Sequence, residues 1–153
     1  MQVIKLSEEN IAIYLKALKE LIKSTINLPP NAITFFCNQW TEERILNNIN
    51  IWLYLMARDG SKTEGILLGA PVEGGVGTII WILVNKKSQN KGIGSLLFEE
   101  ACLQYKKMGA HKVKLTVPDS ETIKFYLKQG MVLEGTHKNH WWGADFWAMG
   151  KSL

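Results

Sequence analysis

Residues 88–95, SQNKGIGS, lie between the apolar run TIIWILV of residues 78–84 and the amphipathic run LLFEEACLQYKKM of residues 96–108. The apolar run predicts a buried strand and the amphipathic run predicts a helix, so the chain passes directly from strand to helix. The start of a helix carries up to about four unpaired backbone N–H groups and the positive end of the helix dipole. This place in the chain is therefore suited to hold an anion such as phosphate.

The residues of this segment leave the start of the helix open. Gly92 and Gly94 have no Cβ atom to obstruct an approaching anion, and Lys91 adds positive charge beside them. The first acidic residues of the helix, Glu99 and Glu100, come after its first turn. We therefore predict an anion site formed by backbone N–H groups, with an ordinary glycine turn as the alternative.

The glycine spacing narrows the choice of anion. A dinucleotide-binding G-x-G-x-x-G motif needs a third glycine where Leu97 stands, and the P-loop motif G-x-x-x-x-G-K-[ST] is absent. The sequence therefore excludes both of these nucleotide-binding loops.

The rest of the pattern predicts an α/β fold with a mixed sheet. Ser7 and Thr41 are expected to cap the first two helices, and Pro29 and Pro30 to end the first helix in a loop that continues to Gln39. Glycine turns are expected at residues 59–60 and 74–75. Strands are expected over residues 2–6, 51–57, 63–70, 77–84 and 112–117, with two more between 131 and 151, and helices over residues 7–24, 41–49, 92–108 and 120–129.

Composition sets the broad class of the protein. The chain has 153 residues, of which 46% are hydrophobic and 21% charged, and this suits a single domain over residues 1–153. No apolar run approaches the roughly 18 residues of a membrane span and no signal-peptide pattern is evident, so we expect a cytoplasmic protein without membrane binding. Cys37 and Cys102 match no metal-ligand spacing, and no metal is expected.

Gln89–Gly94 fits the pattern Q/R-x-x-G-x-G/A and resembles the pyrophosphate loop of the GCN5-related N-acetyltransferase (GNAT) superfamily. Val84 lies eight residues before Gly92, as in the longer V-x-P-x-x-R/Q-x-x-G-x-G motif, although Lys86 stands where the family usually has proline. A second segment, DSETIKFYLKQGM of residues 119–131, resembles the family pattern N-x-x-A-x-x-F-Y-x-x-x-G-F. It departs from that pattern at three positions, Asp119, Thr122 and Met131.

The resemblance covers about residues 77–151, because the final DFWAMGK looks like the closing strand of the family. It implies a mixed, mostly antiparallel sheet of six or seven strands with helices on both faces. In that fold two central strands, here residues 77–84 and 112–117, splay apart to admit the pantetheine arm of acetyl-CoA.

The resemblance also implies acetyl-CoA as co-substrate and direct transfer of its acetyl group to an amine. The end of the fourth strand would pair with the pantetheine and stabilise the oxyanion, and the loop would hold the pyrophosphate. The implied contact residues are Ile82, Leu83, Val84, Gln89, Asn90, Lys91, Gly92, Ile93, Gly94 and Ser95.

Two residues of the second motif have implied roles. Tyr126 occupies the place of the family's catalytic tyrosine, which would protonate or hydrogen-bond the departing thiolate; the alternative is a core tyrosine. Asp119 stands where an asparagine often contacts the cofactor. It either accepts a hydrogen bond from the pantetheine or caps the following helix.

The general base is left open, since TIIWILV contains no acid. Glu134 is the catalytic candidate, and His137, His140 and a water chain ending at backbone carbonyls are the alternatives.

The acceptor amine, on a small molecule or a protein, would enter between residues 27–39 and the last two strands. Aromatic walls there would bind an apolar or aromatic amine, or hold an ammonium group; core packing or a homodimer surface is the alternative. The aromatic residues concerned are Phe35, Phe36, Trp40, Trp141, Trp142 and Trp147.

Two other functional classes are weighed against the enzyme. A non-catalytic acyl-CoA-binding or sensing module on the same fold is compatible with the three departures in the second motif. Nucleic-acid binding ranks last and is not expected, because the net charge of +4 comes from scattered lysines without a basic stripe.

Overall fold

The computed structural model describes residues 1–153 as one seven-stranded sheet with five α-helices. The strands are β1 (Gln2–Lys5), β2 (Leu53–Asp59), β3 (Lys62–Glu73), β4 (Val76–Val84), β5 (Lys112–Val117), β6 (Val132–His137) and β7 (Phe146–Ser152). The helices are α1 (Ile11–Thr25), α2 (Pro30–Gln39), α3 (Glu42–Asn48), α4 (Ile93–Lys107) and α5 (Ser120–Lys128). Short 3-10 turns are η1 (Glu8–Asn10), η2 (Lys86–Ser88) and η3 (Trp141–Gly143).

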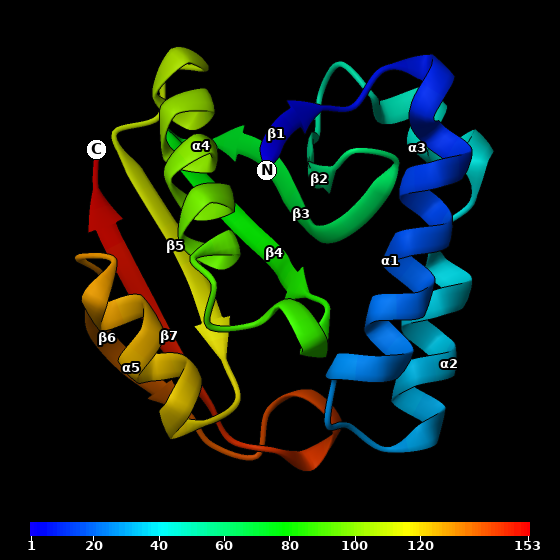
Figure 1. The fold of residues 1–153 in the computed structure, drawn as a ribbon. Helices are drawn as coiled ribbons and strands as arrows, with labels where there is room; N and C mark the ends of the chain where they lie inside the picture. Colours follow the sequence, from blue (N-terminus) through cyan, green and yellow to red (C-terminus); the bar gives the residue numbers. More distant parts are fainter.

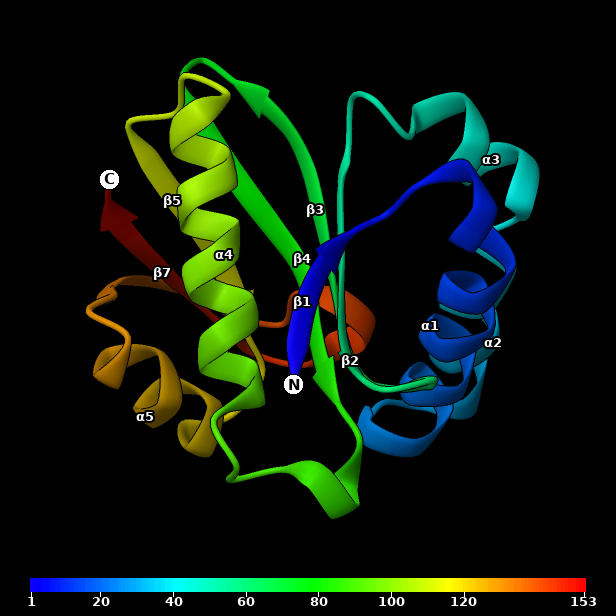
Figure 2. The same cartoon turned by 45° about the horizontal axis from the view of Figure 1, so that its top comes forward.

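The strands lie in the order β1-β2-β3-β4-β5-β7-β6, and only β4 and β5 run parallel. Helices cover both faces of the sheet: α4 and α5 lie on one side, and α1, α2 and α3 lie on the other (Figures 1 and 2). The expected mixed, mostly antiparallel sheet is thus confirmed. None of the helices combines the length and apolar character that crossing a membrane requires.

Strand β2 shows why the sheet can be covered on both faces. Leu53 and Leu55 belong to the core cluster beneath α4 and α5, whereas Tyr54 and Met56 belong to the cluster beneath α1 and α3. Successive side chains of a strand point to opposite faces, so a continuous apolar run fills two cores at once.

Strands β4 and β5 are paired over a short stretch only. The register joins Val76, Gly77 and Thr78 of β4 to residues 112–114 of β5, and no pairs follow. Beyond these pairs the two strands part, and this unpaired region is called the splay below. It confirms the expected divergence of the two central strands.

Tyr105 of α4 closes the paired end of the splay. Its Oη lies 2.9 Å from the carbonyl oxygens of both Ala70 and Thr78. A Cβ atom at Gly77 would collide with the Tyr105 ring, and one at Gly69 would collide with its hydroxyl. These two glycines therefore make room for the tyrosine that fastens α4 to β3 and β4.

Two local expectations are wrong. Residues 30–39, expected to belong to a loop, form helix α2. Pro30 stands in its first turn, where a missing N–H costs nothing. Ser7 does not cap α1 but precedes η1, and its hydroxyl accepts from Asn10 Nδ2 at 3.0 Å. Thr41 caps α3 as expected, accepting from the N–H of Arg44 at 3.1 Å.

Candidate active site

The loop before α4 is anchored to β3 by a buried carboxylate. Ser88 donates through Oγ to Glu64 Oε2 at 2.7 Å, and both side chains are buried. The N–H of Asn85 donates to the carbonyl oxygen of Glu64 at 2.9 Å. Lys62 and Ser88 both hydrogen-bond the Glu64 carboxylate, and these bonds lower its pKa although burial opposes them. The sequence alone did not single out Glu64, since its partner is 24 residues away.

The start of α4 presents backbone donors without partners. Gly92 is the N-cap residue with φ +82° and ψ 0°, and no side chain caps the helix. The first helical bond runs from the N–H of Leu96 to the carbonyl oxygen of Gly92 at 3.0 Å. The N–H groups of residues 93–95 precede that bond, and no carboxylate lies in the first turn. These donors and the helix dipole form an anion-binding end.

Gly92 and Gly94 serve different purposes. A Cβ atom at Gly92 would meet nothing within 4 Å, so this glycine is needed for its positive φ and leaves open space before the helix. A Cβ atom at Gly94 would lie 3.1 Å from Cζ of Phe125 and 3.9 Å from Cγ2 of Val84. The missing Cβ of Gly94 thus lets α4 approach α5 and β4. Its expected role in clearing the path of an anion stays a prediction.

The flanks of the loop are also fixed. Asn90 adopts φ +61°, and Gln89 donates through Nε2 to the carbonyl oxygen of Val84 at 3.2 Å. The hydroxyl of Ser95 accepts from Gln129 Nε2 at 2.9 Å, which ties the first turn of α4 to the end of α5. Lys91 is exposed beside the open end of the helix.

The end of β4 turns alternate N–H groups toward the splay. The N–H of Asn85 donates to β3. The direction of the N–H groups alternates along a strand, so the N–H of Leu83, two residues earlier, faces β3 as well. The N–H groups of Ile82 and Val84 therefore face the splay. Of the three residues expected to donate here, Leu83 is corrected to a residue paired with β3.

Tyr126 lies in the core cluster beneath α4 and α5 and packs edge-on against Phe98 and Phe125. Its side chain is 6% exposed, and its hydroxyl bonds no other protein group. That hydroxyl is not among the fully buried polar groups left without a partner. Burial raises the pKa of Tyr126 well above its ordinary value, which keeps the phenol protonated.

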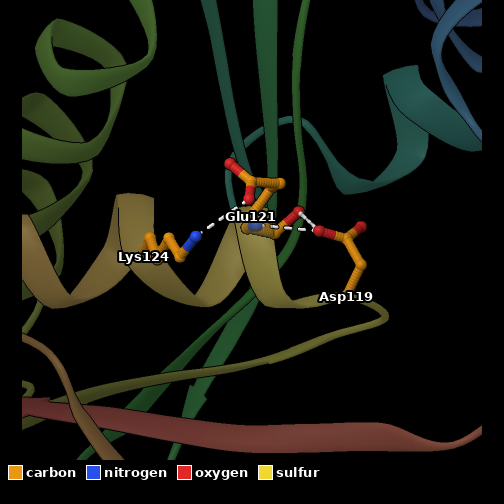
Figure 3. Close-up of polar contacts among 4 residues, drawn as sticks. Asp119, Glu121 and Lys124 are labelled. Atoms are coloured by element: carbon orange, nitrogen blue, oxygen red, sulfur yellow. Dashed lines mark hydrogen bonds and ion pairs between the residues drawn. The ribbon is translucent and has the colours of Figure 1, made fainter.

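Asp119 is the N-cap of α5 (Figure 3). Its Oδ1 accepts from the N–H of Thr122 and from the Thr122 hydroxyl, both at 2.8 Å. Glu121 of the first turn forms an exposed ion pair of 3.0 Å with Lys124. The capping alternative is thus observed, and Asp119 Oδ2 is left for any further acceptor role.

The structure does not bring Glu134 together with the loop. Glu134 lies on edge strand β6, pairs with Lys112 Nζ at 2.5 Å and lies over Gly150. Lys112 belongs to the paired end of β4 and β5, opposite the splay. Glu134 therefore has no part in the mechanism proposed below. His137, the last residue of β6, and His140, on the connection after it, are both exposed and stacked on each other, with ring centroids 4.8 Å apart.

The aromatic residues expected around the acceptor fall into separate groups. Phe35 and Phe36 of α2 contact Trp142 of η3, with ring centroids 5.4 and 6.1 Å apart, and Phe36 contacts Trp81 of β4 at 5.2 Å. Trp81 was not singled out, because it reads as one more apolar residue of a buried strand.

The other three aromatic residues lie elsewhere. Trp40 is buried against Trp52 and beneath the Arg44 guanidinium. Trp147 packs against the core cluster beneath α4 and α5, and Trp141 is 55% exposed.

The donor set fits coenzyme A. The open start of α4 suits a pyrophosphate, and the N–H groups of Ile82 and Val84 suit the amides of a pantetheine arm lying in the splay. No group of three or more His, Cys, Asp or Glu side chains is arranged to hold a metal.

Solved structures share this fold over nearly their whole length. An acetyltransferase of the GNAT family from Streptococcus pneumoniae superposes with a TM-score of 0.81 at 21% identity, covering 99% of each chain. The ribosomal-protein-alanine N-acetyltransferase of Brucella melitensis gives 0.77 at 17% identity, covering 100% of both chains. The PaiA N-acetyltransferase of Thermoplasma acidophilum, solved with coenzyme A, gives 0.75 at 24% identity, covering 99% of this chain and 98% of that one.

Comparison with curated protein sequences finds no match. The model of the acetyltransferase (GNAT) family matches residues 25–131, which include the loop, α4, β5 and Tyr126. Since this match spans more than half of the sequence, the chain belongs to the acetyltransferase (GNAT) family.

Proposed function

We propose that this acetyltransferase moves the acetyl group of acetyl-CoA to a primary amine by direct attack within a ternary complex. The observation that carries the proposal is the unpaired N–H groups of residues 93–95 beside the splay of β4 and β5. Phosphates of CoA bound at the N–H groups of residues 93–95 would direct its pantetheine arm into the splay.

The residues would act on the reaction as follows. The N–H groups of Ile82 and Val84 supply donors for the pantetheine and for the carbonyl oxygen as it gains negative charge. The C–N bond to the amine forms and the C–S bond breaks. Tyr126, whose phenol is protonated at neutral pH and whose pKa burial raises further, donates a hydrogen bond to the departing sulfur. A free thiol has a pKa of about 8.5, so thiolate leaves readily once it is hydrogen-bonded.

The proton lost by the amine passes to water in this proposal. A free alkylammonium has a pKa of about 10.4, and removing it from water into an apolar site lowers that value. Solvent at the exposed side of the splay then accepts the proton without a carboxylate base. We also propose a cytoplasmic location, which the two free cysteines fit.

The test is calorimetric titration with acetyl-CoA and with CoA, followed by release of free thiol in the presence of an amine panel. Binding and amine-dependent thiol release support the proposal. Binding without thiol release over the whole panel would instead favour the acyl-CoA-sensing module. Absence of binding by folded protein would contradict both.

A further inference from the structure

Four aromatic rings from three separate elements form a continuous wall on the α1 and α2 side of the sheet. Phe35 and Phe36 come from α2, Trp81 from β4 and Trp142 from η3. Neighbouring ring centroids lie 5.2–6.1 Å apart and every pair meets edge-on. This set is called the aromatic wall below.

The aromatic wall begins next to the proposed reaction centre and ends in solvent. Trp81 directly precedes Ile82, whose N–H faces the splay. Trp81 and Phe36 are half-buried, whereas Phe35 and Trp142 are 45% and 37% exposed. An acceptor whose amine reaches Ile82 from this side of the sheet would therefore rest its remaining atoms on these rings.

The backbone at Trp142 shows that the ring is held in place against local preference. Trp142 adopts φ +57° and ψ +28°, a left-handed conformation that is unfavourable for a bulky residue. The turn is fixed by bonds from His140 N–H to the Ala144 carbonyl at 2.7 Å and from Asn139 N–H to Asp145 Oδ1 at 2.8 Å. Such strain persists where the surrounding structure imposes it, often at ligand-binding sites.

The elements that carry the aromatic wall lack free carboxylates. Helix α2, PNAITFFCNQ, has no charged residue, and neither has β4, VGTIIWILV. In the connection after β6, Asp145 is paired with Lys138 at 2.9 Å. Acceptors with several positive charges need carboxylate partners, whereas a ring or apolar body gains from contact with aromatic faces.

We propose that the aromatic wall selects the acceptor, and that the acceptor is a monoamine whose amino group is carried on an aromatic or apolar body. Trp142 is the specificity-determining residue, because it is the only ring of the aromatic wall that comes from η3, and it contacts both Phe35 and Phe36 of α2. This inference rests on the proposed acetyl transfer and names the substrate class of that same site.

The test compares 2-phenylethylamine with ethylamine, which has the same amino group without the ring, and with spermidine and kanamycin. The wild-type protein should give a kcat/KM for 2-phenylethylamine about tenfold or more above that of the other three. The variant Trp142→Gly removes the ring and relieves the backbone, so the preference over ethylamine should fall about tenfold. Phe36→Leu, which keeps α2 helical, should lower the same preference.

Trp141→Ala is the matched control, because Trp141 directly precedes Trp142 and lies outside the aromatic wall. It should keep the wild-type preference, and all three variants should bind CoA as the wild type does. Faster acetylation of spermidine or kanamycin, no acetylation of 2-phenylethylamine while another amine of the panel is acetylated, or an unchanged preference in Trp142→Gly would overturn the inference alone. CoA binding without acetylation of any amine would count against the proposed transfer itself. Loss of CoA binding in the wild type would overturn the proposed function itself.

Discussion

Ser88 donates a hydrogen bond through Oγ to Glu64 Oε2 at 2.7 Å, and this bond joins the loop before α4 to the middle of the sheet. Both residues are buried, so neither partner is exchanged readily for water. The bond holds η2, and η2 leads directly into the residues that start α4. We infer that Glu64 is a positioning residue for the pyrophosphate loop.

Ser88→Ala should therefore weaken binding of acetyl-CoA by roughly tenfold with little change in kcat at saturation. It should also lower the free energy of unfolding by about 1–3 kcal/mol, because the buried carboxylate loses a donor. Calorimetric titration and urea unfolding measure the two effects. An unchanged KM for acetyl-CoA would show that the bond serves stability only.

The hydrogen bonds from Lys62 and Ser88 to the Glu64 carboxylate give a signed pH dependence. The folded-state pKa of Glu64 lies below its ordinary value of 4.5, so its carboxylate contributes stability that is present above pH 4.5. That contribution is lost as the pH falls through the lower folded-state value. Urea unfolding should show a larger difference between wild type and Ser88→Ala at pH 7 than at pH 3. An equal difference at both pH values would contradict this assignment.

Gly92 and Gly109 flank the two ends of α4 and form a matched pair, with φ values of +82° and +86° and nothing within 4 Å of an added Cβ. Alanine at either position should cost about 1–2 kcal/mol of unfolding free energy through the left-handed backbone. Only Gly92→Ala should weaken CoA binding, because its Cβ would stand before the free N–H groups. Equal loss of CoA binding in both variants would show that the effect is one of general stability.

Gly94→Ala should lower stability through Phe125, whose Cζ lies 3.1 Å from the added Cβ. Such a close contact costs about 1–3 kcal/mol when the neighbours cannot move. Thermal unfolding of Gly94→Ala, Phe125→Leu and the double variant measures the coupling between the two sites. In the double variant, the smaller leucine should recover part of the stability lost through Gly94→Ala. Strictly additive losses of stability would show that Gly94 does not act through Phe125.

Tyr126→Phe should reduce kcat by roughly 100-fold, the lower range for a lost acid catalyst, and leave the affinity for CoA unchanged. The fold should tolerate the change, since the hydroxyl bonds no protein group. Glu134→Gln serves as the comparison, because Glu134 contacts Lys112 at the end where β4 and β5 are paired, away from the splay. The kcat of this variant should match that of the wild type. Steady-state kinetics on both variants measure the two kcat values. A reduced kcat in Glu134→Gln alone would contradict both assignments.

The sequence was sufficient to predict the parts of the fold that local patterns determine. Helix α4 followed from its apolar spacing and its terminal residues, and the hairpin turns from Gly60 and Gly74, whose φ values are positive as such turns require. Helix α2 was missed because consecutive prolines and a run rich in β-branched and aromatic residues predict a loop. There Pro30 starts a helix, and packing of α2 against α1 stabilises it.

The candidate site was predictable where a motif is contiguous and not where contacts are long-range. The open start of α4 could be predicted, because the glycines, the missing acids and the preceding strand lie together in the sequence. Glu64 reaches Ser88 across 24 residues, and Trp142 reaches α2 from the other end of the chain, so neither contact has a local signature. Glu134 was placed near the site by its distance from Gly130 in sequence, but the sheet order carries it to the far edge.

The most direct measurement of the central claim is a ¹⁵N-resolved NMR titration of the wild-type protein with CoA. We expect the largest amide shifts at Ile93, Gly94 and Ser95, followed by Ile82 and Val84 at the splay. The Gly109 amide, at the other end of α4, should move little. Absence of binding, or shifts that leave the start of α4 unchanged, would contradict the account that this helix end holds the pyrophosphate of acetyl-CoA.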